Sequence, residues 1–167
     1  MVTAEKQWIK RADVAGMIRK DLHRAFPGVK FSVRSRTYSI DVNWTDGPQE
    51  SAVKGIIGAY EDRHFDGMID MEYHIDHYMM PDGTISQWRS SGTQGSMGLV
   101  PAFEHALPAG AVPVRLNTGY LHTSREYSEV MRQRCLPLVP TNLDSDIERE
   151  QWLWRIMREQ DGAQWTH

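Results

Sequence analysis

The strongest hydrophobic pattern of the chain lies in residues 30–45, where apolar side chains recur at every second position on either side of a short break. Period two is the pattern of a strand that buries one face. The break is short, so the pattern predicts a tight β-hairpin. The apolar residues of its two strands are Phe31, Val33, Ile40, Val42 and Trp44.

The period changes after this hairpin, because Val53, Ile56, Ile57 and Tyr60 are spaced as on one side of a helix. We therefore predict a helix over residues 49–63, followed by a long strand over residues 69–79. Eight side chains of this region are expected to be buried in one cluster: Phe31, Val33, Ile40, Val42, Trp44, Ile56, Ile57 and Ile69.

Three blocks of this region resemble a known family. They read Phe-Pro-Gly-Val-Lys-Phe-Ser-Val-Arg-Ser at 26–35, Trp-Thr-Asp-Gly-Pro at 44–48 and Phe-Asp-Gly-Met-Ile-Asp at 65–70. In this order they are similar to the large polyvalent protein-associated domain that is the twenty-ninth of its numbered series. The resemblance covers residues 12–80 and returns more weakly at 120–128. The hairpin lacks the small glycine-containing insertion that relatives often carry between Tyr38 and Ile40.

This resemblance implies a genetic context and no reaction. Such domains are typical of phages, plasmids and conjugative elements, in proteins that help incoming DNA establish itself against host defences. The family offers no catalytic residues that could be transferred to this chain.

The rest of the chain completes an α+β pattern. Residues 3–25 are predicted to form a helix with Val14, Ala15, Ile18 and Leu22 on one side. A turn at Pro81, Asp82 and Gly83 leads into a strand at 84–89. Residues 90–98 are predicted to be a flexible loop, residues 102–107 an irregular segment or a short helix, and residues 116–121 a strand. A capping box from Thr123 to Glu126 predicts a helix over 124–136, and a further helix is expected at 144–159. The fold class is α+β with a mostly antiparallel sheet.

The connector Pro137-Leu138-Val139-Pro140 suggests a division of the chain. We predict a single α+β domain at 1–136. Residues 137–167 would be a connector and a C-terminal helix that packs on this domain or on a partner. That helix has apolar residues around more than half of its circumference, which is more than one buried face requires.

Charge is distributed unevenly along the chain. Residues 1–47 hold nine Lys and Arg against five Asp and Glu, whereas residues 48–167 hold ten against seventeen. The first part could contact phosphates, and its candidate residues are Lys20, Arg24, Arg34 and Arg36. Because the acidic remainder would repel a nucleic-acid backbone, we expect weak or no binding to free nucleic acid.

Catalytic and metal-binding signals are weak. Asp70, Glu72, His74 and Asp76 alternate along one strand, but such side chains stand too far apart to close around a cation. Cys135 is the single cysteine, so an internal disulfide is excluded. It lies among the apolar residues on one side of a predicted helix. We predict no catalytic residues, no metal and no cofactor. A metal-dependent enzyme remains the third alternative.

The leading hypothesis is a non-enzymatic accessory protein that binds and inhibits a host defence system, of the anti-CRISPR or anti-restriction type. A nucleic-acid-binding module is the second hypothesis. Neither a signal peptide nor a membrane-length apolar run is present, so a cytoplasmic location is expected. The predicted partner-binding residues, which combine acidic groups with possible aromatic anchors, are Asp144, Asp146, Glu148, Glu150, Trp152 and Trp154.

Overall fold

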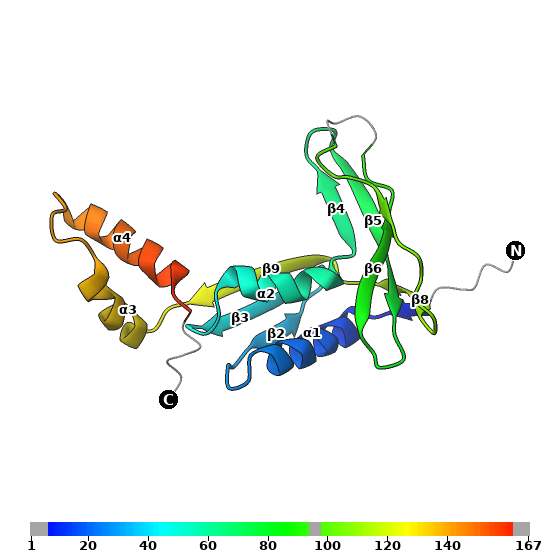
Figure 1. Ribbon diagram of the computed structural model, residues 1–167, viewed down its shortest axis with the longest axis horizontal. Coiled ribbons are helices and arrows are strands. Elements are labelled where there is room, and N and C mark those ends of the chain that lie inside the picture. Colours follow the sequence, from blue (N-terminus) through cyan, green and yellow to red (C-terminus); the bar gives the residue numbers. More distant parts are fainter. Residues whose placement is uncertain (1–6, 94–97, 162–167) are drawn as a thin grey trace, which may run out of the picture.

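The computed structural model describes residues 7–93 and 98–161, and it has the predicted α+β architecture (Figure 1). Its helices are α1 (Arg11–Ala25), α2 (Glu50–Ile57), α3 (Glu129–Cys135) and α4 (Asp146–Glu159), with the 3₁₀ turns η1 (Gly58–Tyr60) and η2 (Leu136–Leu138). Its strands are β1 (Gln7–Ile9), β2 (Ser32–Ser35), β3 (Ser39–Thr45), β4 (Arg63–Asp66), β5 (Met71–Met79), β6 (Ile85–Ser90), β7 (Phe103–Glu104), β8 (Val112–Leu116) and β9 (Tyr120–Glu126).

The strands form two sheets. One has three strands in the order β2-β3-β9, and the other has six strands, with β1-β8-β5-β6-β7 in line and β4 paired to β5. Most pairings are antiparallel, as predicted, whereas β1 with β8 and β3 with β9 are parallel. In Figure 1 the six-stranded sheet stands at one end, α1 and α2 lie with the three-stranded sheet in the middle, and α3 and α4 project at the other end.

The main hydrophobic core lies where α1 and α2 meet the sheets. The buried side of α1 is the predicted one, with Val14, Ala15, Ile18 and Leu22. Of the eight predicted core residues, five are buried in this cluster, and Phe31 and Ile56 are partly buried against it. The prediction for Ile69 is wrong, because this side chain is 44% exposed.

Ile69 is exposed because the predicted strand 69–79 begins only at Met71, after a turn that joins it to strand β4. Residues 67–70 form a turn, in which Asp70 has a φ of 51°, and β4 returns along β5 in antiparallel register. The Asp66 carboxylate accepts a hydrogen bond from the Met68 backbone at 2.9 Å. This local bond favours a turn over a strand at these positions.

The first helix is shorter than predicted. Residues 7–9 form strand β1, and the helix starts at Arg11; the predicted helical residues 3–6 lie outside the described part of the chain. Trp8 pairs with Arg115 of β8 in the parallel register. Likewise, residues 102–107 contain the short strand β7 and no helix, because Ser90 of β6 pairs with Phe103. Of the predicted loop 90–98, residues 94–97 lie outside the description.

The strand and helix boundaries near residue 120 are also corrected. The predicted strand 116–121 is two strands separated by residues 117–119, and the predicted capping box lies inside β9. The Thr123 hydroxyl donates to Glu50 of α2 at 2.6 Å instead of capping a helix. Helix α3 begins after Ser128, whose hydroxyl accepts from the Met131 backbone.

Helices α3 and α4 form a hairpin with a hydrophobic cluster of its own. Its buried residues are Met131, Cys135, Val139, Leu153 and Met157. The predicted domain boundary after residue 136 falls within this cluster, and the division into domains stays a prediction. No helix of the described residues is long and apolar enough to cross a membrane.

Candidate functional site

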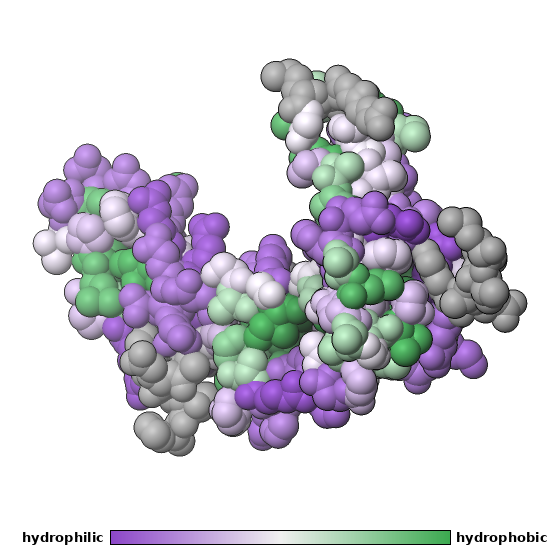
Figure 2. Space-filling view, turned by 45° about the vertical axis from the view of Figure 1, so that its right-hand side comes forward, coloured by the Kyte–Doolittle hydropathy of each residue, from purple (hydrophilic) through white to green (hydrophobic). Residues whose placement is uncertain are grey.

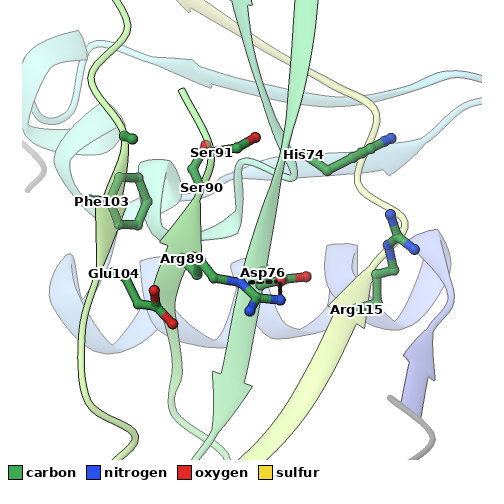
Figure 3. Close-up of a pocket in the computed structure, with 9 residues that line it drawn as sticks. His74, Asp76, Arg89, Ser90, Ser91, Phe103, Glu104 and Arg115 are labelled. Carbon is green, nitrogen blue, oxygen red and sulfur yellow. Dashed lines mark hydrogen bonds and ion pairs between the residues drawn. The ribbon is translucent and has the colours of Figure 1, made fainter. Parts of the chain in front are cut away.

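An open pocket of about 630 Å³ lies on the solvent-facing side of the six-stranded sheet (Figure 3). Strands β5, β6, β7 and β8 all contribute to it, because side chains on alternate positions of neighbouring strands share one face. Its lining residues are His74, Asp76, Arg89, Ser90, Ser91, Ala102, Phe103, Glu104 and Arg115.

The charged groups of this pocket form a row across the sheet. Arg89 donates to Asp76 from two nitrogens, at 3.0 and 2.6 Å. Glu104 lies beside Arg89 in the β6–β7 register, and Arg115 of β8 stacks its guanidinium over Trp8 at 5.2 Å. Opposite charges on neighbouring strands stabilise a sheet. The pocket is therefore nearly neutral, and its arginines already have partners within the sheet.

The residues considered as a metal site from the sequence are Asp70, Glu72, His74 and Asp76, and their carboxylates make separate contacts in the structure. Glu72 accepts from Arg63 at 3.0 Å, Asp76 accepts from Arg89, and Asp70 lies in the turn before β5. Within residues 7–93 and 98–161, no three His, Cys, Asp or Glu side chains are grouped closely enough to hold a metal ion. Glu72 and Asp76 thus each have an arginine partner on a neighbouring strand.

A second polar cluster joins the two sheets. The Asp62 carboxylate is buried and accepts from the backbone of Thr118 at 2.9 Å, from that of Gly119 at 3.1 Å and from Arg63 at 2.8 Å. Arg11 donates to the Thr118 carbonyl at 3.0 Å. Gly119 has a φ of 69°, and a Cβ there would meet the Tyr38 carbonyl oxygen at 2.2 Å. This cluster fixes the turn between β8 and β9 and has a structural role.

His77 is fully buried on strand β5. Burial lowers the pKa of its imidazole, while the Ala59 backbone and the carboxylates of Asp62 and Asp76 act in the opposite direction. A buried neutral imidazole makes stability depend on pH, because the unfolded chain can bind a proton that the folded chain excludes.

We therefore expect the protein to lose stability as the pH falls from 7.5 to 5.5. The unfolded histidine gains its proton below its ordinary pKa of 6.5, so the loss begins there and continues until the lowered folded-state pKa is reached. Urea unfolding at four pH values measures this slope. His77→Leu should flatten the slope, and the exposed control His105→Leu should retain it. An unchanged slope in His77→Leu would contradict this account.

Cys135 belongs to the cluster between α3 and α4, and burial raises the pKa of its thiol. A raised pKa lowers the thiolate fraction on which nucleophilic reactivity depends. Cys135 is therefore best explained as a core residue of the α3–α4 cluster.

The six predicted partner-binding residues all lie on α4 or just before it, and all are exposed. Trp152 stacks with Arg155 at 4.6 Å, and Trp154 meets Tyr127 edge-on at 5.5 Å. Glu150 forms an ion pair with Arg132 of α3. The two tryptophans thus retain exposed area of 37% and 50% beside acidic groups.

The hairpin is fixed to the rest of the protein at its base. Arg125 at the end of β9 donates to the carbonyls of Asp46 at 2.6 Å and Gly47 at 3.0 Å, and to that of Gln160 after α4 at 2.8 Å. The Asp46 carboxylate accepts from the backbone and the hydroxyl of Ser128. These contacts hold both the entry and the exit of the hairpin.

The four predicted nucleic-acid-binding residues are exposed, and the structure divides them between two elements. Lys20 and Arg24 lie on α1, where Arg24 pairs with Asp21 at 3.4 Å. Arg34 lies on β2, and Arg36 follows it and donates to Asp41 of β3 at 3.1 Å. A groove of about 660 Å³ between α1 and β2 is lined by Gly16, Arg19, Lys20, His23, Gly28, Val29, Lys30 and Phe31.

Two aromatic residues on the same sheet as Arg34 were missed from the sequence. Strand β9 pairs in parallel with β3, which places Tyr120 beside Ser39 and His122 beside Asp41. The signal for a strand here is weak, since Leu121 is the single aliphatic residue of Tyr120–Glu126. The pairing joins segments about 80 residues apart, which local periodicity does not report.

Comparison with models of protein families identifies a family for most of the chain. The family model described as large polyvalent protein associated domain 29 matches residues 9–128. It spans both sheets with α1 and α2, and it ends at the residue that caps α3. No curated protein and no solved structure matches the chain.

Proposed function

Because the chain belongs to the family of large polyvalent protein associated domain 29, we propose that it is a non-enzymatic accessory protein that binds and inhibits a host defence protein. The family is associated with the polyvalent proteins of mobile genetic elements. A product of such an element gains from disabling CRISPR or restriction systems, which act on incoming DNA. Binding a defence protein needs an exposed surface and no catalytic group.

The observation that carries this proposal is the α3–α4 hairpin, which projects from the rest of the protein (Figure 1). It lies beyond the residues that the family model matches. Apolar atoms remain at its surface among hydrophilic ones (Figure 2). Its large exposed side chains are Val130, Leu136, Leu138, Ile147, Trp152 and Trp154. An element with its own core and exposed aromatic groups suits partner binding, since tryptophans are frequent anchors at interfaces.

The acidic residues at the start of α4 indicate which kind of partner the hairpin would bind. Between residues 144 and 150 there are four acidic side chains, Asp144, Asp146, Glu148 and Glu150, against the single basic Arg149. Glu150 is paired with Arg132, so the acidic rim beside the apolar anchors consists of Asp144, Asp146 and Glu148. Such a rim is complementary to a basic protein surface. Proteins that hold nucleic acid have such surfaces, which favours a nucleic-acid-binding component of a defence complex.

The test is co-purification of the tagged protein from a host that carries an active CRISPR or restriction system, together with plaque counts of a targeted phage. We expect the intact protein to retain a defence component and to raise plaque numbers. Ile147→Ala with Trp152→Ala should weaken the measured affinity by about 30-fold or more, the effect of losing one interface hot spot.

Trp8→Ala is the matched control, because Trp8 is a tryptophan with 63% exposure on β1, far from the hairpin in the fold. It should retain both partner and plaque effect. Inhibition that survives both hairpin substitutions with unchanged affinity would reject the hairpin as the contact surface. If no defence component is retained in any of these hosts, the defence role itself is rejected.

A further inference from the structure

One face of the three-stranded sheet is covered by none of the described helices. Val33, Ile40 and Val42 point to the helices α1 and α2 and are buried in the main core. The intervening side chains therefore point to the opposite side, which we call the open face. On β2 and its flanks this face carries the basic residues Lys30, Arg34 and Arg36, all exposed.

These cations follow an edge strand, since β2 pairs with β3 and with no other described strand. Along an extended strand, Lys30 and Arg34 lie about 13 Å apart, and Arg34 and Arg36 about 7 Å apart. Lys30 also lines the groove between α1 and β2, whose lining includes Arg19 and Lys20 and no acidic residue. A negatively charged chain laid along β2 would therefore meet cations in succession.

Aromatic rings lie on the same face, two strands away. Tyr120 and His122 of β9 stack with their ring centres 6.3 Å apart and an angle of 19° between the planes. Tyr120 is 55% exposed, and the Arg63 guanidinium lies over its ring at 5.8 Å. In register, Asp41 on β3 lies between Arg34 and His122, and Ser39 lies beside Tyr120, so a carboxylate and a hydroxyl separate the rings from the cations.

We propose that the open face binds single-stranded nucleic acid, with phosphates along β2 and bases on Tyr120 and His122. Cations beside exposed rings are the combination that such binding uses, because every base can stack on a ring. In a duplex the bases are paired and stacked inside, so the rings would have nothing to bind. An acidic peptide would meet the cations and leave the rings unused.

The net negative charge of residues 48–167 does not oppose this binding directly. The acidic residues 144–150 belong to the hairpin, whereas the open face belongs to the three-stranded sheet. Of the described residues on the open face, two carry carboxylates: Asp41, which is paired with Arg36, and Glu126 at the end of β9, which lines a pocket with Lys30. The expectation of weak binding rested on the sum of charges, while affinity depends on the charges near the bound strand.

The test is fluorescence anisotropy of end-labelled 12-nucleotide single strands of DNA and RNA and of the matching duplex, at several salt concentrations. Single strands should bind more tightly than the duplex. Tyr120→Ala with His122→Ala should weaken binding by about tenfold or more, because stacked bases lose that contact. Lys30→Gln with Arg34→Gln should reduce the salt slope by about 1.4, at 0.7 per phosphate contact.

Arg149→Gln on the hairpin is the control for charge, and Trp152→Ala is the control for an exposed ring; both should leave the affinity unchanged. Circular dichroism of each variant checks folding, and exposed positions tolerate these changes. Tighter binding of the duplex, equal binding of poly-glutamate, or undiminished binding by the ring variant would each overturn the inference. So would the absence of binding at low salt. The proposed defence role uses the hairpin, so loss of one activity leaves the other measurable.

Discussion

Replacing Trp44 by alanine should lower the free energy of unfolding by about 3 to 5 kcal/mol, as measured by urea unfolding at pH 7.5. The side chain is 3% exposed and packs on Phe31 with ring centres 5.7 Å apart. Its indole nitrogen donates to the Pro48 carbonyl at 3.0 Å. Removing the ring leaves a cavity between the β2–β3 hairpin and the start of α2. It also leaves the buried Pro48 carbonyl without its donor.

Trp8→Ala is the matched control for this prediction, because the same side chain is removed from an exposed position on β1. Its cost should stay below about 1 kcal/mol, the range of an exposed cation–π contact. Equal losses of unfolding free energy for the two substitutions would show that Trp44 does not anchor the β2–β3 hairpin. The difference between them isolates the contribution of burial.

The elements that the sequence predicts well are those that bury one face within a single segment. Strand β3 alternates between buried and partly exposed side chains along its length, and α1 buries its four predicted residues. Periodicity reports such burial directly, because the spacing of apolar residues follows from the geometry of the element. Helix α4 was predicted from its end signals instead, since its first turn is acidic and its last turn is basic.

The elements that the sequence predicts poorly are decided by partners far along the chain. Residues 123–126 satisfy the local pattern of a capping box, yet all seven residues of β9 pair with β3. Backbone pairing along a whole strand outweighs one cap, whose worth is about 1 kcal/mol. Strand β1 has three residues, too few to show a period.

The candidate surfaces follow the same division. The acidic and aromatic residues of α4 could be named because they lie within one helix. The open face could be predicted only in part. Arg34 and Arg36 lie in the predicted β2–β3 hairpin, whereas Tyr120 and His122 join this face only because β9 pairs with β3. Only the parallel pairing of β3 with β9 places the rings on the same face as the cations, and no local spacing encodes it.

A second large effect is expected at the junction of the two sheets, where Asp62→Ala should lower the free energy of unfolding by about 3 to 5 kcal/mol. The carboxylate is 5% exposed and accepts three hydrogen bonds. Its loss leaves the backbone donors of Thr118 and Gly119 buried and unpaired. It also removes a partner of Arg63, which retains Glu72.

Asp62→Asn distinguishes charge from hydrogen bonding at this junction. Its amide oxygen can still accept from the turn, so its cost should be smaller than that of alanine, with the remainder due to the lost ion pair. Glu61→Ala is the neighbouring control, because Glu61 is exposed and its carboxylate lies 3.8 Å from His64. Urea unfolding of the three variants supplies the comparison. Should Asp62→Ala cost no more than Glu61→Ala, the turn between β8 and β9 is held by Arg11 alone, and the buried carboxylate is not what joins the sheets.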